Sequence, residues 1–516
     1  MSKISAIDFA NNVDSNRKRL IKHCRDNGLT VNENETLENV VTINDDINIK
    51  QSEETFVVEF KDLDGNNFVP PQYVKKGESA IIPEGYPELD SEYLEFVEWA
   101  FPVDDDLTNV QRDILCLPQY QTKYDETTGQ RPTYLFCYFE ESYLSPLFAI
   151  PTRTNTFIDW GDGSEPQQVT TNTINHTYAN KGLYVIKIYG DNYEIGGNSN
   201  AGLFTTSYYT TCLLKAYMGE NGKVSNFQKC YSLKKAVLSL KQTTLNYTFS
   251  ECSSLERVVI PNSVISTIYN VFYNCTSLTN VIMTGSFGDS LSLYILEAKF
   301  VSGCSSLKSF RIPNKCKSIG SSAFNGCASL VDLNLPNSIE SIKDSAFSGM
   351  YNLKNINIPE NITFISNSTL QYCHGLRKIV LSSNISTIGA AAFSSCSNLL
   401  EIVIQNPLIK LENPNIFNGC TSVSNLVLPQ DFDGLGTINF SYFALSNDCL
   451  IDITKKLKDN SSTSAKTITF SENKHKTRME TIYLNEFDEE VPYKTNGAIS
   501  LLEKIQNKNW TVSFSN

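Results

Sequence analysis

One short phrase recurs nine times between Phe227 and Val423, and it constrains the fold of this chain more than any other feature. The phrase reads Phe-x-x-Cys-x-x-Leu, then two residues, an aliphatic residue, any residue and a second aliphatic residue, often followed by Pro. Successive anchors, which are Cys or Met, lie 22, 23, 29, 23, 23, 23, 23 and 24 residues apart: Cys230, Cys252, Cys275, Cys304, Cys327, Met350, Cys373, Cys396 and Cys420. A nearly constant interval over so many copies predicts a solenoid in which each copy forms one turn.

The interval and the pattern together predict a leucine-rich-repeat solenoid. Intervals of about 20 to 29 residues with Leu-x-x-Leu-x-Leu spacing place one short strand per turn in a parallel sheet. We expect the Leu and the two aliphatic residues of each copy to point inward, and the Phe and Cys to stack into ladders. Since no turn can bury its apolar face alone, stability must come from contacts between neighbouring turns.

The phrase also resembles one particular repeat family. The Cys-x-x-Leu unit, preceded by bends such as Ser322-Ala323-Phe324 and Ala391-Ala392-Phe393, is similar to the BspA-like leucine-rich repeats of bacterial surface and phage proteins. The resemblance covers about two fifths of the chain. It implies a short helical bend in each turn, and therefore an α/β solenoid, in a protein that acts at a surface.

Length and composition predict a folded chain of several domains. The chain has 516 residues, of which 41% are hydrophobic and 19% charged, as in globular proteins. The formal net charge is −13 and no basic stripe occurs. Because nucleic-acid binding needs clustered Lys and Arg, we expect no nucleic-acid partner.

The cysteines are best explained by packing. Eight of the fourteen are repeat anchors, and Met350 occupies the same register. A position that accepts Met does not depend on sulfur chemistry, so these thiols are expected to be small buried apolar groups. The other six show no Cys-x-x-Cys or zinc spacing: Cys24, Cys116, Cys137, Cys212, Cys316 and Cys449. We therefore expect reduced thiols when the chain is made.

The sequence shows no export or membrane signal. Residues 1–29 contain no apolar run of signal-peptide length. No stretch reaches the roughly 18 apolar residues of a membrane-spanning helix. We expect synthesis in a cytoplasm without an export signal of the chain's own, and no membrane insertion.

Residues 1–50 are predicted to form an N-terminal helical segment. Apolar residues recur loosely at helical spacing between Ala6 and Arg25, and Asn27-Gly28 is a stop signal. Residues 29–41 resemble a short segment of phage tail and fibre proteins, which implies that this part attaches the chain to a particle. The alternative is an ordinary helix that caps the next domain.

Residues 51–124 are predicted to form a small β module. Strands are expected at Phe56–Phe60, after Gln72, at Phe96–Trp99 and near Pro118–Tyr120, with an Asp-Gly hairpin turn in Asp62–Asn66. The order of these motifs resembles the internalin B-repeat module, a β-grasp-like domain of extracellular adhesins. The resemblance implies a spacer.

Residues 125–205 are predicted to form a β-sandwich. Three motifs of this segment resemble the hallmarks of the PKD-type immunoglobulin-like domain: Asp159–Ser164, His176-Thr177-Tyr178 and Gly182–Ile188. His176 with Asp159 or Asp162 raises the possibility of a metal or acid–base site. Without a second His or a Cys nearby, a structural hydrogen bond is the favoured reading.

Residues 206–435 are assigned to the solenoid and residues 436–516 to a C-terminal α/β cap, which the open end of a solenoid requires. The sequence predicts a helix from Ala444 to Leu457, a strand at Ala465–Phe470 and a helix at Ile499–Asn507. The segment resembles the cap of BspA-like repeats in phage and prophage proteins. No role is assigned to Glu472–Asn496.

No catalytic or metal-binding motif is found in the sequence. The four histidines are not paired at ligand spacing, and nucleotide-binding, serine-hydrolase and zinc-peptidase motifs do not occur. The acidic runs Asp104–Asp106 and Asp488–Glu490 fit solvated loops. The prediction is a chain that is not an enzyme and uses no cofactor or metal.

The candidate binding surface is the exposed face of the repeat sheet. In each copy the residue between the last two aliphatics faces outward, and we call this column the stripe: Val237, Val259, Ile282, Arg311, Asn334, Asn357, Val380, Val403 and Val427. Six of the nine are β-branched aliphatics, either because such residues favour strands or because another chain covers the stripe. The candidate binding residues are Arg311, Asn334, Asn357, Val380 and Val403.

Taken together, these modules predict a multidomain, mainly β bacteriophage virion protein. We expect a structural fibre, appendage or decoration protein, assembled in the host cytoplasm, whose repeats bind other virion proteins and a host-surface glycan or protein. An oligomer is expected. The alternative is a BspA-type adhesin on a bacterial cell surface.

Overall fold

The computed structural model describes residues 55–102, 105–142, 144–196, 203, 211–264, 266–267, 269–283, 295–411, 413, 415–436, 438–459, 466–484, 490–491 and 498–515. The predicted attachment segment and most of the insertion after Met283 lie outside these residues. The chain divides into two units. The smaller unit consists of Met1–Lys61, Asn67–Gly85 and Asp105–Cys116, and the larger one of Asp62–Asn66, Tyr86–Asp104 and Leu117–Asn516.

The described part of the smaller unit is built on strand pairs. Strands β1 (Thr55–Phe60) and β2 (Gln72–Lys75) pair antiparallel, as the Asp-Gly turn signal predicts. The first residues of β4 (Ile114–Thr122) pair in parallel with β1. Val58, Phe60 and Cys116 are fully buried, because alternate residues of these strands point to one apolar side.

The larger unit begins with a β segment that is continuous with the solenoid. Its strands are β3 (Leu94–Ala100), the rest of β4, β5 (Thr133–Phe139), β6 (Leu147–Ala149), β7 (Arg153–Thr154), β8 (Phe157–Asp159), β9 (Gln167–Gln168), β10 (Thr173–Asn175), β11 (Gly182–Tyr189), β12 (Asn192–Ile195) and β13 (Leu213–Tyr217). Strand β5 pairs antiparallel with β13, and β13 pairs in parallel with the first repeat strand. One eight-stranded sheet, in the order β19-β17-β15-β13-β5-β11-β8-β9, therefore extends from this segment into the repeats.

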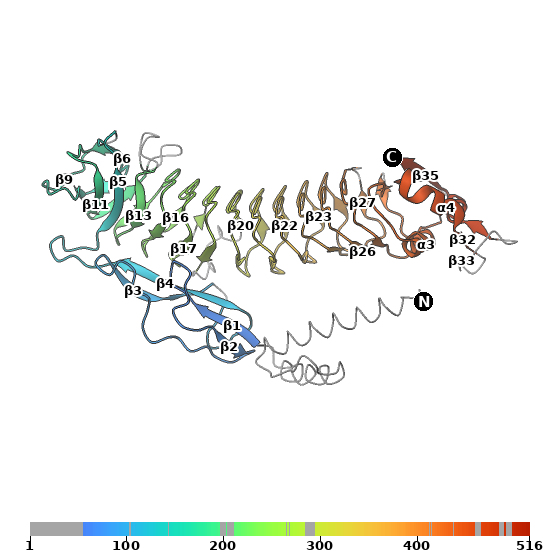
Figure 1. Cartoon of the computed structure of the whole chain (residues 1–516), viewed down its shortest axis with the longest axis horizontal. Coiled ribbons are helices and arrows are strands. Elements are labelled where there is room, and N and C mark those ends of the chain that lie inside the picture. Colours follow the sequence, from blue (N-terminus) through green and yellow to red (C-terminus); the bar gives the residue numbers. More distant parts are fainter. Residues whose placement is uncertain are drawn as a thin grey trace, which may run out of the picture. The chain divides into compact units, whose positions relative to one another are not determined.

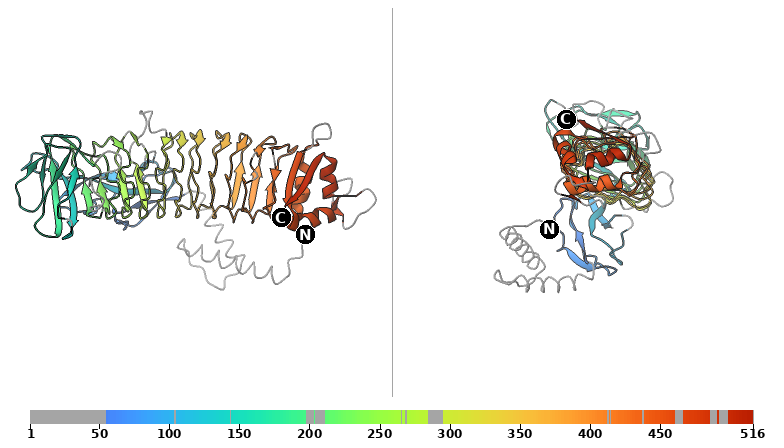
Figure 2. Two further views of the ribbon diagram at one scale, coloured as in Figure 1. Left: turned by 90° about the horizontal axis from the view of Figure 1, so that it is seen from above. Right: turned by 90° about the vertical axis from the view of Figure 1, so that its right-hand side faces the viewer.

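The solenoid carries two ladders of short parallel strands, which form the row of turns in Figures 1 and 2. The first ladder contains the predicted repeat strands β15 (Lys235–Val237), β17 (Arg257–Ile260), β19 (Asn280–Met283), β24 (Lys378–Leu381), β26 (Glu401–Ile404) and β28 (Asn425–Val427). The second contains two-residue strands: β16 (Thr244–Leu245), β18 (Ser266–Thr267), β20 (Ile295–Leu296), β21 (Ser318–Ile319), β22 (Ser341–Ile342), β23 (Phe364–Ile365), β25 (Thr387–Ile388), β27 (Lys410–Leu411) and β29 (Leu435–Gly436). In addition, β14 (Gly222–Val224) pairs in parallel with β12.

The bends between the strands are turns, so the expected helical bend, and with it the α/β character of the solenoid, is not found in the described residues. The residue before each anchor has a positive φ in every copy: Lys229, Glu251, Asn274, Gly303, Gly326, Gly349, Tyr372, Ser395 and Gly419. A left-handed residue ends a right-handed turn and redirects the chain. Four of these positions hold Gly, which accepts this conformation without strain.

The anchors bind neighbouring turns through sulfur as well as through packing. Every anchor thiol that has a preceding turn donates to a carbonyl of that turn, at 3.0–3.3 Å from Sγ to O. The carbonyl of Phe227, for example, accepts both the backbone N–H of Cys230 and the Sγ–H of Cys252. Burial raises the pKa of the Cys373 thiol to about 12. Cys373 is therefore a protonated donor, a role that Met350 cannot share.

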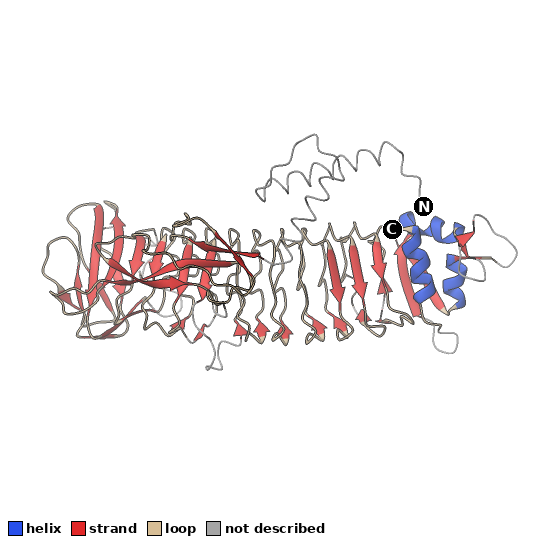
Figure 3. Ribbon diagram, turned by 90° about the horizontal axis from the view of Figure 1, so that it is seen from below, coloured by secondary structure: helices blue, strands red, loops and turns tan. Residues whose placement is uncertain are grey.

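The C-terminal cap closes the last turn with helices, which are coloured blue in Figure 3. Its elements are β30 (Ile438–Asn439), α3 (Asn447–Lys456), β31 (Lys466–Ser471), the π-helix η2 (Glu472–Lys476), α4 (Thr477–Thr481), β32 (Tyr483–Leu484), β33 (Glu490–Val491), β34 (Ile499–Ser500), α5 (Leu501–Asn507) and β35 (Trp510–Ser515). The predicted helices and strand are confirmed as α3, α5 and β31, whereas η2 and α4 were not predicted. Cys449 of α3 binds Leu426 of the last turn through its sulfur, so the cap continues the ladder of thiols.

Candidate binding surface on the solenoid sheet

Six of the nine stripe positions lie on strands of the first ladder, whereas Arg311, Asn334 and Asn357 lie outside strands, so the expected strand is not found in those three turns. Val380 pairs in register with Val403, and Val403 with Val427. The same register joins Val259 to Ile282 at the other end. Because parallel strands lie about 4.8 Å apart, the stripe residues of these paired strands lie beside one another.

The first part of the stripe is covered by the chain itself. Val237 is 7% exposed and Ile282 is 3% exposed. Val237 and Val259 line a small cavity together with Leu63, Pro118 and Tyr120, all of which belong to the larger unit. At these turns an apolar stripe residue is explained by contacts within this unit, and no second chain is needed.

Polar contacts surround this covered part. The Nζ of Lys215 lies 2.6 Å from Oδ2 of Asp90, which also accepts the hydroxyl of Tyr217. Lys235 forms an ion pair with Asp64 at 2.8 Å, and Arg257 donates to the carbonyl oxygen of Leu63 at 2.9 Å. Cationic side chains in the column beside the stripe thus meet acidic and carbonyl groups of the covering segment.

The contacts of Asp90 are reflected in its titration. Burial raises the pKa of this carboxyl group, but the hydrogen bonds from Lys215 and Tyr217 outweigh burial and lower the pKa below its ordinary value. The same arrangement raises the pKa of Tyr217, through burial first and its hydrogen bond to Asp90 second. Asp90 therefore stays ionised where it accepts both donors.

The last part of the stripe is open, and we call Asn334, Asn357, Val380, Val403 and Val427 the open patch. Asn334 and Asn357 are exposed and Val380 is 40% exposed, whereas Val403 and Val427 are half-buried. Arg311, the remaining predicted site residue, is also half-buried. In the neighbouring column, Lys378 and Glu401 form an ion pair at 3.1 Å. The predicted site residues thus lie on one face, in the part of the stripe that the chain leaves accessible.

His176 occupies a structural position. Its Nε2 lies 2.7 Å from Oδ2 of Asp162, and its ring stacks on Trp160 with centroids 4.9 Å apart. Burial raises the pKa of Asp162, but hydrogen bonds from Ser164 and His176 outweigh it and lower the pKa to about 2. The favoured reading of His176, a structural hydrogen bond, is confirmed. Among the described residues no group of three or more His, Cys, Asp or Glu side chains is placed to hold a metal ion.

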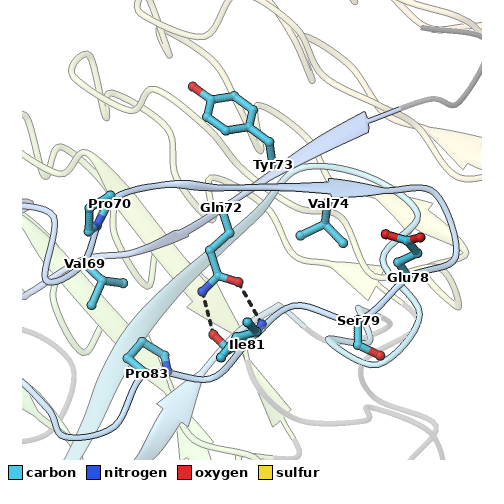
Figure 4. Close-up of a pocket in the computed structure, with 9 residues that line it drawn as sticks. All are labelled: Val69, Pro70, Gln72, Tyr73, Val74, Glu78, Ser79, Ile81 and Pro83. Atoms are coloured by element: carbon cyan, nitrogen blue, oxygen red, sulfur yellow. Dashed lines mark hydrogen bonds between the residues drawn. The ribbon is translucent and has the colours of Figure 1, made fainter. Parts of the chain in front are cut away.

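The smaller unit contains an open apolar groove of about 480 Å³ beside β2, shown in Figure 4. The side-chain amide of Gln72 bonds both to the backbone N–H and to the carbonyl of Ile81, at 2.7 and 2.5 Å. Val69, Pro70 and Pro83 contribute apolar walls, and Glu78 is the one carboxylate of the lining. In the described part of the chain, no helix is both long and apolar enough to cross a bilayer.

The comparison with family models identifies the repeats. Residues 221–292 and 294–415 match the family model of the BspA type leucine rich repeat region, in six copies. The fold is similar to a leucine-rich repeat protein from Bacteroides ovatus (15% identity, 53% of this chain and 80% of that one, TM-score 0.34). It is also similar to the T. pallidum leucine rich repeat protein (23% identity, 41% and 86%, TM-score 0.29) and to the pneumococcal vaccine antigen PcpA (17% identity, 59% and 67%, TM-score 0.32). No curated protein matches the chain.

The described part of the chain is mainly β with few helices, and residues 221–292 and 294–415 carry leucine-rich repeats. Its repeats are of the BspA type, as the Cys-x-x-Leu phrase predicts.

Proposed function

We propose that this chain is a non-enzymatic, adhesin-like binding protein whose open patch contacts another protein. The observation that carries the proposal is the column Val380–Val403–Val427, which is aligned on one sheet and runs from the exposed Val380 to the half-buried Val403 and Val427. β-branched side chains on an exposed strand face offer apolar area at a small cost in side-chain entropy. The BspA-type match supports a role in binding.

The contacts at the covered part of the stripe indicate which groups a partner of the open patch would present. There, Leu63 and Tyr120 lie against Val237 and Val259, while acidic and carbonyl groups meet Lys235 and Arg257. A partner of the open patch is expected to present apolar side chains to Val380 and Val403 in the same way. Its charged groups would exchange with the ion pair of Lys378 and Glu401, which costs little because the Lys378 side chain is half exposed.

Adhesion fits two settings. The resemblances of residues 29–41 and of the cap favour a virion fibre, appendage or decoration protein, with other virion proteins or a host surface as partners. The BspA-type repeats are at least as consistent with a bacterial surface adhesin. Mass spectrometry of purified phage particles and of the envelope fraction of the producing cells separates the two settings. The internalin-like and PKD-like modules would serve as spacers in either one, and the expected oligomer stays a prediction.

The binding proposal is tested with the labelled full-length chain on a panel of intact bacterial cells, with and without protease treatment. We expect saturable, protease-sensitive binding that falls at least about tenfold in the double variant Val380→Lys/Val403→Lys, because two charges would enter an apolar contact. Phe364→Lys is the matched control, since Phe364 is an exposed apolar residue of the second ladder. Equal binding by the double variant and the wild type would contradict the proposal.

A further inference from the structure

A second exposed surface lies on the bend edge of the solenoid, away from the stripe positions. Tyr351 and His374 directly follow the anchors Met350 and Cys373, and Tyr372 directly precedes Cys373. The rings of Tyr351 and His374 are stacked, with centroids 5.4 Å apart and planes 10° apart. Tyr372 meets His374 edge-on at 6.4 Å. These three rings from two consecutive turns form what we call the aromatic platform.

Exposure distinguishes the platform from the aromatic ladder of the core. Phe249 and Phe272 also stack at 5.5 Å, but both are completely buried. Tyr351 is 49% exposed and Tyr372 is 45% exposed. Stacking in the core follows from the repeat itself, whereas half-exposed rings contribute little to folding and keep part of their area available to a ligand.

The backbone at Tyr372 has the conformation that the residue before every anchor adopts. Tyr372 has a φ of 63°, and the other turns hold Gly in four copies and a different non-glycine residue in four. The positive φ therefore belongs to the repeat, although a bulky residue in this region is strained by about 1 kcal/mol or more. The chain thus retains an exposed aromatic ring where its own preceding turns, at Gly326 and Gly349, use the unstrained residue.

Polar groups border the platform on the side of the next turn. The hydroxyl of Ser397 lies 3.3 Å from Nδ1 of His374, and the side-chain amide of Asn398 donates to the carbonyl of His374 at 2.9 Å. The exposed guanidinium of Arg377 lies 3.4 Å from the carbonyl of Asn398. On the opposite side the equivalent positions are small, Ala328 and Gly349, so the rings stand above the edge there.

The size of this surface favours a small ligand. A stable protein interface buries about 1,200–2,000 Å² in total, which is more than three side chains of two turns supply, and small residues flank the rings. A sugar ring presents an apolar face of C–H groups and a rim of hydroxyl groups. An aromatic face with an amide and a guanidinium beside it complements both.

We propose that Tyr351, Tyr372 and His374 form a glycan-binding platform, on which a pyranose ring stacks while Asn398 and Arg377 bind its hydroxyl groups. The platform extends the proposed adhesin function to a second ligand class and a second surface. Protein binding by the open patch and glycan binding by the platform are separable, because the two sets of residues occupy different edges of each turn.

The chain itself supplies conservative substitutions for the test. Tyr351→Ala introduces the residue found at Ala328, and Tyr372→Gly introduces the residue found at Gly349. Both variants should fold like the wild type, and Tyr372→Gly should be no less stable because it removes the strained φ. Tyr231→Ala is the matched control, since Tyr231 follows the first anchor but has Glu251 and Ser253 at the positions corresponding to Tyr372 and His374.

Binding is measured by saturation-transfer NMR with the methyl glycosides of glucose, galactose, mannose and N-acetylglucosamine, and on an array of bacterial surface oligosaccharides. We expect at least one glycan to bind, an affinity loss of about tenfold for each ring removed, and no change for Tyr231→Ala. Val380→Lys/Val403→Lys should bind the same glycan like the wild type, so failure of the open patch is distinguished from failure of the platform. The proposal is overturned if no glycan binds, or if Tyr351→Ala and Tyr372→Gly bind like the wild type while keeping its thermal stability.

Discussion

The two ends of the stripe have the same kind of surface, which is covered at one end and open at the other. At Val237 and Ile282 the column is covered and almost completely buried, whereas at Val380 the equivalent side chain is 40% exposed. The repeat phrase is the same at both ends, so the difference comes from what lies against the sheet and not from the turn itself. A solenoid face of this composition can be buried by other segments of chain, and the open end is the part on which a partner can do the same.

Placing a charge at each end of the stripe tests the difference between the covered and the open end most directly. Val237→Asp should lower the free energy of unfolding by about 3 kcal/mol, because a carboxylate would be buried without a partner. Val427→Asp, at the half-buried end, should cost within about 1 kcal/mol. Denaturant unfolding followed by circular dichroism measures both. Equal costs at the two ends would mean that the covered state does not persist in solution.

A core substitution gives the scale against which both ends are judged. Cys327→Ala should cost about 2 kcal/mol, from lost packing and from the lost bond of its Sγ to the carbonyl of Val301. Cys327→Val keeps most of the volume but has no donor, so it should recover part of this loss. Both are compared with the wild type in the same denaturant titration, and full recovery by Val would show that the thiol bond contributes nothing.

Acid should weaken the covered end selectively. The lowered pKa of Asp90 means that its contribution to folding is complete above the pKa of the unfolded state, about 3.9, and is lost as the pH falls through the lower folded value. Asp90→Asn should therefore cost about 1 kcal/mol near neutral pH, allowing for solvent screening. Asn also tolerates the positive φ of residue 90.

The pH dependence is read from unfolding midpoints between neutral pH and pH 3. Wild type and Asp90→Asn should converge as the pH falls. A constant difference between the two at every pH would exclude the Lys215 and Tyr217 contacts as its source.

The smallest effect is expected at the ion pair beside the open patch. Lys378→Ala should change the free energy of unfolding by no more than about 0.5 kcal/mol, because the Lys378 side chain is half exposed. The same variant in the cell-binding assay reports whether a partner uses this charge. A larger stability loss would show that the open end is already occupied in the protein as purified.

Local sequence patterns predicted the features of the fold that depend on contacts between neighbouring turns. The interval between anchors specified the parallel ladder, and polar caps such as Ser446 and Ser500 accompany the predicted helices. The prediction of a helical bend was wrong because it rested on the family resemblance at Ala323 and Ala392. The Gly before several anchors already indicated a left-handed turn.

Contacts between distant segments were not predicted. Arg257 binds Leu63 across 194 positions, and no periodicity carries that information. The aromatic platform could have been found, since Tyr351 and His374 share one position of the phrase in adjacent turns. The binding surface was predicted from the strand positions of the phrase, which do not include the residues beside the anchors.

The continuous sheet from β9 to β19 also has a mechanical consequence. A protein that links two surfaces is under tension, and the junction between separately folded domains is the usual place where such a link yields. Here backbone hydrogen bonds cross from β5 through β13 into the first turns, so the load passes into the repeats. Each turn of about 23 residues that then peels away would release roughly 75 Å of extended chain. The solenoid would lengthen in steps under force and close again when the force is removed.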